Sequence, residues 1–310
     1  MTEAREPAIK GVVPAIYTPF KDDLSVDEKS LQLLADRVAS VDGVGGVFCT
    51  GHAGEVAALS VEEQKRVVKA VSEAVGDRVP VLAGLYCDNL DQAITIARNS
   101  REAGASVITV FPPGALAGAM TNPELVHSWH ETIIRKAGVK VCLFQFPLSS
   151  PLGYSAQTLS RLVTLPEVVA VKEGSGNPRQ YEDNVVELSA LEKPVSVLTS
   201  NNDWWLADLT LGGDGVLSGS GPVLAREQVE MYRAVTSNDL AKARAVQARI
   251  RPLLRTLYRA PGIDSHTRMK LALVIMGVLP NANVRPPLMP LEPGERKGLE
   301  KVLSQAGLLS

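Results

Sequence analysis

Eight short apolar runs alternate with longer amphipathic segments along most of this chain, and this alternation limits the possible folds more than any other feature. The runs are rich in Val, Ile and Leu, as expected for strands covered on both faces. They lie at residues 12–20, 46–51, 79–86, 105–113, 139–147, 168–174, 195–201 and 215–221. Between them, apolar residues recur at i, i+3, i+4 and i+7, and several segments begin with the N-cap formers Ser, Asp or Asn. The pattern predicts eight strands separated by helices.

Strands joined by helical crossovers pair in parallel, so two architectures fit the alternation. One is a doubly wound open sheet, and the other is a closed (β/α)8 TIM barrel. The count of eight and the absence of a G-x-G-x-x-G motif after the first run favour the barrel. After about residue 222 only helical segments follow. We therefore expect an α/β barrel over residues 1–222 and a C-terminal helical region, packed on the barrel, over residues 223–310.

Composition narrows the classes of partner and compartment. The net charge is −2 and the acidic and basic residues are spread along the chain, which gives no reason to expect nucleic acid or an anionic membrane as a partner. The three cysteines lie far apart without metal-ligand spacing, which favours reduced thiols in a cytoplasmic protein. The polar start at residues 1–11 lacks the apolar core of a signal peptide, and no apolar run reaches membrane-spanning length.

One lysine, Lys172, closes the sixth apolar run in the stretch VVAVKEG. In a parallel barrel, functional groups gather at the C-terminal ends of the strands. Lys172 shares a strand face with Val168 and Ala170, and an inward-facing lysine there would be partly desolvated. Desolvation lowers the pKa of an amine and makes it more nucleophilic toward carbonyl carbons. The alternative is a strand-end lysine paired with Glu173 or another nearby carboxylate.

The loop after the second run, CTGHAGE, contains a second candidate feature. Gly51 and Gly54 flank His52 and Ala53 and leave backbone N–H groups free to converge on an anion. Such a nest suits a small carboxylate, although a plain tight turn is an equal alternative.

No metal or nucleotide site is evident in the sequence. His127 and His130 share a helical segment at i, i+3, but a third ligand in register is missing, so we expect an exposed or half-buried helix face. His266 is expected near a helix N-terminus. No nucleotide-binding loop is present, and we expect neither a metal nor a cofactor.

Four short motifs occur in a characteristic order: TPF at 18–20, G-x-x-G-E at 51–55, VKE at 171–173 and RPPL at 285–288. Together they resemble the dihydrodipicolinate synthase / N-acetylneuraminate lyase family from about residue 10 to about residue 305. The resemblance implies an eightfold barrel with a C-terminal helical region, often tetrameric. It also implies class I aldolase, lyase or dehydratase chemistry, in which Lys172 forms a Schiff base with pyruvate or another 2-keto acid. The loop 51–55 would bind the carboxylate of that keto acid.

The chain departs from the family pattern at several polar positions. The family commonly has two hydroxyl side chains between the loop glycines, where this chain has His52 and Ala53. The carboxylate would then be held by backbone N–H groups and the imidazolium of His52, with Thr18 as a supporting hydroxyl. Phe144, in FQFP, stands where the family usually has a proton-relaying tyrosine, which leaves His52 as the titratable candidate. The stretches 148–153 and 110–118 also lack the usual arginine and tyrosine, so we expect neither a typical dihydrodipicolinate synthase nor an ordinary sialic acid lyase.

Apolar side chains at or just after the strand ends suggest the nature of the second substrate. They are Phe111, Leu116, Phe144, Phe146, Trp204 and Trp205. An apolar mouth would favour a less polar or aromatic aldehyde, similar to the substrates of hydratase-aldolases. The alternative is that these rings belong to the core between helices and barrel. Ser218 and Ser220 would supply polar contacts to substrate, or else cap a helix.

The sequence thus predicts a Schiff-base lyase that acts on a 2-keto acid, with Lys172 as nucleophile and His52 in proton transfer. The substrate would contact Thr18, Gly51, Ala53, Gly54 and Phe144, together with Ser218 and Ser220. A homo-oligomer, tetramer or dimer, is expected from the family alone. Two alternatives stay open: a dehydratase of 2-keto-3-deoxy sugar acids, and a catalytically silent keto-acid-binding protein.

Overall fold

The eight predicted strands form one parallel sheet in the computed structural model, which describes residues 9–119 and 122–309. The strands are β1 (Gly11–Pro14), β2 (Val47–Cys49), β3 (Val81–Leu85), β4 (Val107–Val110), β5 (Val141–Gln145), β6 (Val168–Glu173), β7 (Ser196–Thr199) and β8 (Gly215–Ser218). Their order is β1-β8-β7-β6-β5-β4-β3-β2, and parallel bridges from Val12 to Val44 and from Ala15 to Phe48 link the two ends. The barrel is therefore nearly closed, and the predicted TIM barrel is confirmed.

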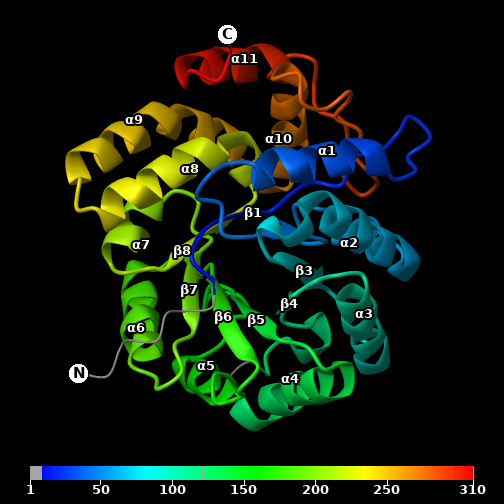
Figure 1. Cartoon of the computed structure of the whole chain (residues 1–310), viewed down its shortest axis with the longest axis vertical. Coiled ribbons are helices and arrows are strands. Elements are labelled where there is room, and N and C mark those ends of the chain that lie inside the picture. Colours follow the sequence, from blue (N-terminus) through cyan, green and yellow to red (C-terminus); the bar gives the residue numbers. More distant parts are fainter. Residues whose placement is uncertain (1–8, 120–121, 310) are drawn as a thin grey trace.

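Helices follow the strands in alternation and surround the barrel (Figure 1). They are α1 (Glu28–Ala39), α2 (Val61–Val75), α3 (Leu90–Glu102), α4 (Pro123–Ala137), α5 (Ala156–Leu162), α6 (Pro178–Ser189), α7 (Trp205–Thr210) and α8 (Gly221–Thr236). The N-cap side chains of α1 to α6 each accept a backbone N–H from the first turn, and the caps of α1, α2, α3 and α5 are Ser, Asp or Asn positions that the sequence predicted. Local capping therefore fixes where most of these helices begin.

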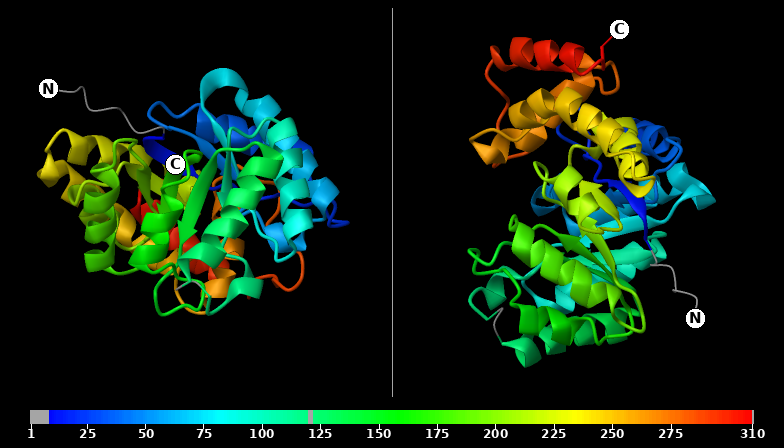
Figure 2. Two further views of the ribbon diagram at one scale, coloured as in Figure 1. Left: turned by 90° about the horizontal axis from the view of Figure 1, so that it is seen from below. Right: turned by 90° about the vertical axis from the view of Figure 1, so that its left-hand side faces the viewer.

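Three more helices, α9 (Leu240–Leu257), α10 (Ser265–Ile275) and α11 (Glu295–Gln305), follow the barrel. They stack as a layer on one side of it, which the right-hand view of Figure 2 shows. The predicted boundary between residues 222 and 223 stays a prediction, since α8 extends across it. Of the two predicted regions, residues 1–8, 120–121 and 310 lie outside the described residues.

Strand alternation sends neighbouring side chains of β6 in opposite directions. Lys172 aligns with Phe144 of β5 and Leu198 of β7, and its amine lies 3.7 Å from the Phe144 ring centroid. Glu173, the next residue, bonds instead to Asn184 of α6. Lys172 therefore faces the barrel interior, and Glu173 faces the surrounding helices.

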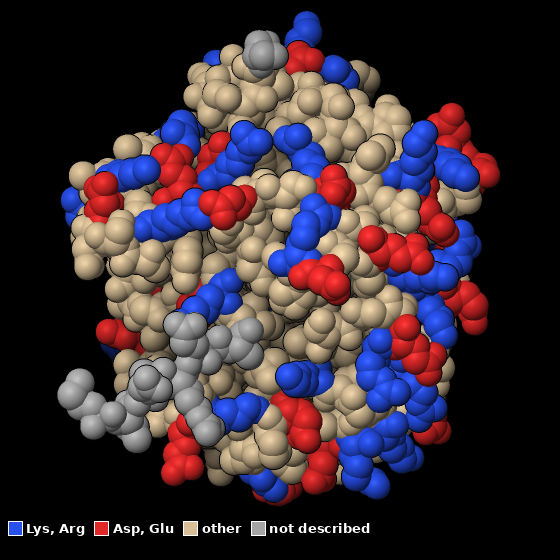
Figure 3. Space-filling model, viewed as in Figure 1, with Lys and Arg blue, Asp and Glu red and all other residues tan. Residues whose placement is uncertain are grey.

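The surface charges are mixed and the cysteines are unpaired, as the sequence led us to expect. On the face in Figure 3, Lys and Arg side chains are interspersed with Asp and Glu. All three cysteines are free thiols: Cys49 and Cys142 are buried and Cys87 is half-buried. Within residues 9–119 and 122–309, no helix combines the length and the apolar character needed to cross a membrane.

Candidate active site

Lys172 is buried at the C-terminal end of β6 among aromatic rings. Its Nζ lies 3.7 Å from the ring centroid of Phe144, 5.6 Å from that of Phe48 and 5.8 Å from that of Phe111. No carboxylate of the described residues forms an ion pair with it, and Glu173 points away. Burial therefore lowers the pKa of Lys172 to about 8. This amine has a larger uncharged fraction at neutral pH than a surface lysine has.

Phe144 is the closest ring to this amine, and its face attracts the ammonium form. We expect Phe144→Leu to lower the pKa of Lys172 further, by roughly half a unit, because a cation–π contact contributes about 0.5–1 kcal/mol. The pH dependence of Lys172 acetylation by acetic anhydride, followed by peptide mass spectrometry, measures this shift. Phe146→Leu is the matched control, since that ring packs on Phe144 at 4.4 Å. An unchanged or raised midpoint in Phe144→Leu would contradict the role of this ring.

The loop 51–55 follows β2 and is braced from several sides. Thr18 Oγ1 donates to the carbonyl of Gly54 at 2.7 Å, and Glu55 N donates to His52 O at 3.0 Å. A Cβ on Gly51 would lie 2.4 Å from the Phe48 ring, so only glycine fits there. The N–H groups of residues 51–54 donate to no acceptor in the described part of the chain. These N–H groups are therefore available to an anion.

His52 projects from this loop into an aromatic cluster. Its ring centroid lies 4.6 Å from that of Phe111, 5.6 Å from Tyr86 and 6.2 Å from Phe144. Desolvation by the packed rings, followed by the charges of Lys172 and His266, lowers the pKa of His52 to about 3, although the residue is partly exposed to solvent. The imidazole is therefore neutral at pH 7. A neutral ring cannot form the ion pair that we expected between an imidazolium and a carboxylate.

Ser218 and Ser220 lie buried at the end of β8 and bond to each other, with their oxygens 3.0 Å apart. Ser218 also donates to Asn202 Oδ1 at 2.8 Å, and Ser220 N donates to the hydroxyl of Tyr258 at 3.1 Å. Tyr17 donates its hydroxyl proton to the carbonyl of Gly219. The two serines therefore belong to a network that ties the barrel to the C-terminal region. Neither tyrosine was identified from the sequence, although Tyr17 directly precedes the TPF motif.

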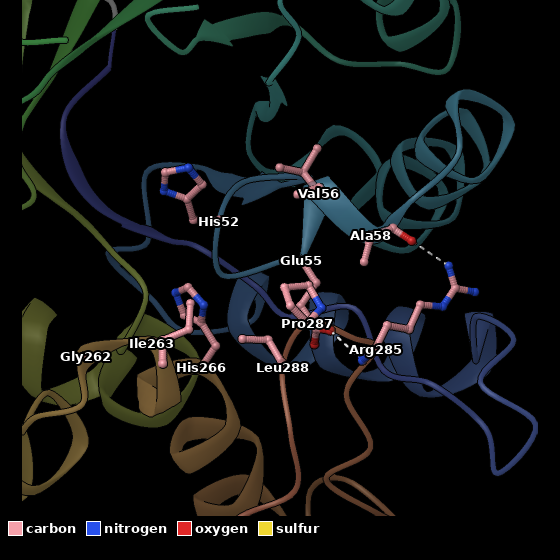
Figure 4. Close-up of a pocket in the computed structure, with 11 residues that line it drawn as sticks. His52, Glu55, Val56, Ala58, Gly262, Ile263, His266, Arg285, Pro287 and Leu288 are labelled. Carbon is pink, nitrogen blue, oxygen red and sulfur yellow. Dashed lines mark hydrogen bonds between the residues drawn. The ribbon is translucent and has the colours of Figure 1, made fainter. Parts of the chain in front are cut away.

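A pocket of about 410 Å³ opens between the loop after β2 and the C-terminal region (Figure 4). Its lining consists of His52, Glu55, Val56, Ala57, Ala58, Gly262, Ile263, His266, Arg285, Pro287 and Leu288. Lys172 is not in this lining. Burial is the main reason that the pKa values of His52 and His266 are lowered, and the positive charge of Lys172 is the second reason for both. The pocket therefore adjoins the buried lysine. His266 lies in the first turn of α10, near the helix start as expected, but its place in the pocket was missed.

Charged residues of two sequence motifs, Glu55 and Arg285, form hydrogen bonds and ion pairs across this wall of the pocket. Glu55 accepts hydrogen bonds from the ammonium of Lys270 and, at 3.0 Å, from the backbone N–H of Arg285. The Arg285 guanidinium pairs with Glu63 at 2.7 Å and donates to Ala58 O at 2.8 Å. Glu55 of the G-x-x-G-E loop and Arg285 of RPPL thus join the barrel loop to the C-terminal region.

The apolar side chains that we predicted at the mouth of the barrel differ in their burial. Phe111 and Phe144 are buried in the core, and Leu116 and Phe146 are half-buried against the core. Trp205 is fully buried in the core, whereas Trp204 is exposed.

The expected exposure of two helix histidines is wrong, since His127 and His130 are both buried in α4. His130 Nδ1 lies 2.8 Å from Val126 O, and its Nε2 lies 3.3 Å from the Tyr154 hydroxyl. Packing of α4 on the barrel, which the i, i+3 spacing does not reveal, buries this face. Across the described ranges, no three His, Cys, Asp or Glu side chains gather as metal ligands.

Comparisons with known proteins identify the family of this chain. The family model of the Dihydrodipicolinate synthetase family matches residues 8–306. The chain is 32% identical over 297 residues to the 4-hydroxy-tetrahydrodipicolinate synthase of Methanosphaerula palustris, which covers 95% of this chain and 98% of that protein. It is 31% identical over 296 residues to the protein of the same name from Methanothrix thermoacetophila, which covers 96% of each.

A solved structure shares the whole architecture. The dihydrodipicolinate synthase of Thermotoga maritima superposes with a TM-score of 0.88 at 26% identity, covering 97% of this chain and 99% of that one. The motifs that carried the resemblance are thus part of a match along nearly the whole length. This chain belongs to the dihydrodipicolinate synthetase family, whose members are lyases of the aldolase type.

Proposed function

We propose that this protein is a Schiff-base-forming lyase that joins or cleaves a 2-keto acid, such as pyruvate, and an aldehyde, with Lys172 as its nucleophile. One observation carries the proposal. The Lys172 amine is buried without a carboxylate partner among the described residues, and its pKa is lowered to about 8. It lies at the end of β6, where parallel barrels place their reacting groups.

The proposed reaction uses the lysine as an electron sink. The free amine attacks C2 of the keto acid, and its proton moves to the ketone oxygen. The new hydroxyl takes a second proton from solvent and leaves as water, which gives an iminium. A proton then leaves C3, and the electron pair of that C–H bond forms an enamine. The enamine carbon attacks the aldehyde carbon, a C–C bond forms, and the new alkoxide takes a proton. Water hydrolyses the iminium and restores the amine. Cleavage follows the same steps in reverse.

The keto-acid carboxylate would be held by the unused N–H groups of residues 51–54, as in other backbone nests. Thr18 supports this loop through the carbonyl of Gly54. His52 donates one hydrogen bond from its neutral ring and, because Phe144 has no hydroxyl, accepts the C3 proton in the family tyrosine's place. Ser218 and Ser220 would supply further polar contacts to the substrate.

The aldehyde partner is proposed to be less polar than a sugar aldehyde, and aromatic aldehydes are favoured. Phe111, Phe144 and Phe146 form an apolar wall beside the lysine. On the basis of this wall we propose that the chain is neither a sugar-acid dehydratase nor a typical dihydrodipicolinate synthase, although its relatives carry the synthase name. We also propose a homo-oligomer, tetramer or dimer, in the cytoplasm.

The pH dependence of Schiff-base formation provides one prediction. A pKa of about 8 leaves roughly one-tenth of Lys172 uncharged at pH 7. The rate constant for adduct formation with pyruvate should therefore rise about tenfold per pH unit below pH 8 and level off above it. The pKa values of His52 and His266 are about 3 and about 4, so neither ring should produce a second inflection near pH 6.5 in the pH profile of this rate constant. Rapid-quench mass spectrometry from pH 6 to 9.5 measures the profile, and a plateau reached only near pH 10 would contradict it.

The function itself is tested by product analysis. Pyruvate is incubated with benzaldehyde or with glyceraldehyde, and the 4-hydroxy-2-keto acid is quantified by chromatography and mass spectrometry. We expect more efficient turnover of benzaldehyde. A pyruvate adduct without any aldol product would favour the silent binding protein, and preference for glyceraldehyde would overturn the apolar partner.

A further inference from the structure

The pocket beside His52 has an unusual balance of polar groups. Its two charged residues are already engaged: Glu55 with Lys270, and Arg285 with Glu63. Among the described lining residues, the imidazoles of His52 and His266 are the polar side chains that bond to no described group. The rest of the lining is apolar or backbone. A ligand in this pocket would thus meet an apolar wall and two uncharged hydrogen-bonding rings.

We infer that this pocket receives the apolar substituent of the aldehyde, and that Ile263 determines specificity for it. The inference rests on the proposed function and deepens it, because it adds a subsite formed by the C-terminal region. Figure 4 shows Ile263, His266 and Leu288 gathered on the side of the pocket below His52. His52 also reaches the aromatic cluster around Lys172, since its ring packs on Phe111 and Phe144. It thus joins the subsite to the reacting lysine.

The subsite wall is fixed before any ligand binds. Ile263 lies in a short 3₁₀ turn, Gly262–Asp264, that precedes α10. The buried guanidinium of Arg268 donates to the carbonyl of Arg259 at 2.8 Å and to that of Pro261 at 3.3 Å. It also pairs with Asp264 at 3.3 Å. These bonds hold the turn from both sides, so little ordering is needed when a ligand binds.

Ile263 gives the clearest chemical indication of the ligand. Its side chain is 62% exposed although it faces this pocket, and large exposed aliphatic groups at a concave site favour an apolar ligand. A volume of about 410 Å³ accommodates a ring or a short alkyl chain together with solvent. A charged or polyhydroxylated substituent would lose its hydration and find only two neutral imidazoles in return. The subsite therefore selects an uncharged, largely apolar substituent.

The first test measures binding without the Schiff-base reaction. Benzyl alcohol is the probe, and saturation-transfer NMR compares the wild type with Ile263→Asp and Val186→Asp. Val186 of α6 is the matched control, because it is branched, 61% exposed and absent from the pocket lining. We expect the signal to survive in Val186→Asp and to disappear in Ile263→Asp. No wild-type signal, or an equal signal in all three proteins, would overturn the subsite.

The second test measures its effect on turnover with the same variants. For benzaldehyde, Ile263→Asp should lower kcat/KM about tenfold or more through KM, since small hydrophobic contacts discriminate by such factors. Pyruvate adduct formation should stay unchanged, as should turnover of glyceraldehyde. An equal loss for both aldehydes would overturn the specificity role. Benzyl alcohol binding that depends on Ile263 without any pyruvate adduct would instead refute the lyase and retain the subsite.

Discussion

Lys172→Met is expected to lower kcat by about 10⁴-fold or more, as loss of a covalent nucleophile does in other enzymes. Methionine fills nearly the same space among Phe48, Phe111 and Phe144 but has no amine to attack a carbonyl carbon. Steady-state turnover of pyruvate with benzaldehyde measures the effect. Activity within tenfold of the wild type would refute the nucleophilic role of Lys172.

The same substitution should leave the fold at least as stable, which separates a catalytic loss from a folding defect. Burial lowers the pKa of Lys172 to about 8, below that of an unfolded lysine. The folded protein therefore binds this proton more weakly. The resulting destabilisation grows as the pH falls from the pKa of an unfolded lysine to about 8, and it is complete below pH 8. Thermal unfolding at pH 7 should show an equal or higher Tm. Lys193→Met is the control, since Lys193 donates to Val168 O at the opposite end of β6, at 3.1 Å, and should leave turnover unchanged.

The second large effect concerns stability. Glu55→Gln should lower the free energy of unfolding by about 3–5 kcal/mol, because it leaves the ammonium of Lys270 buried without its counter-charge. Lys270 is fully buried, and its remaining polar partner in the described structure is the carbonyl of Asn283, at 2.8 Å. Urea unfolding at pH 7 measures the loss. We expect slower pyruvate adduct formation as well, since Glu55 ends the loop that we propose holds the carboxylate.

Glu63→Gln provides the matched control for this buried pair. Glu63 pairs with Arg285 in a half-buried position, where an ion pair contributes about 1 kcal/mol or less. The double substitution Glu55→Gln with Lys270→Met should recover part of the stability, because it removes the unpaired charge. A loss in Glu55→Gln no larger than in Glu63→Gln would show that the buried pair does not hold the loop.

The fold was predictable because its determinants are local. Buried parallel strands have continuous apolar runs, and capping residues such as Ser60 and Asn89 begin the helices, so both can be identified from neighbouring residues. The position of Lys172 follows equally from the strand period and from the rule that barrel sites lie at strand ends. Phe144 beside the lysine follows from the resemblance of FQFP to the family's fifth-strand motif.

The rest of the candidate site depends on contacts between distant segments, which spacing along the sequence cannot reveal. His266 reaches the pocket only because the C-terminal helices pack on the barrel. Tyr258 bonds to Ser220 from α9's end, 38 positions away. The neutral state of His52 depends on Lys172 and on surrounding rings from several strands. Buried His130 illustrates the same limit, since i, i+3 spacing does not say which helix face packs inward.

The most direct test of the lyase proposal is intact-mass spectrometry after pyruvate and borohydride are added together, followed by peptide mapping. Reduction fixes an imine as a stable secondary amine on the lysine that formed it. We predict one pyruvate adduct per chain, located at Lys172, and no adduct in Lys172→Met. An adduct on another lysine, or equal labelling of wild type and Lys172→Met, would contradict the proposed Schiff base.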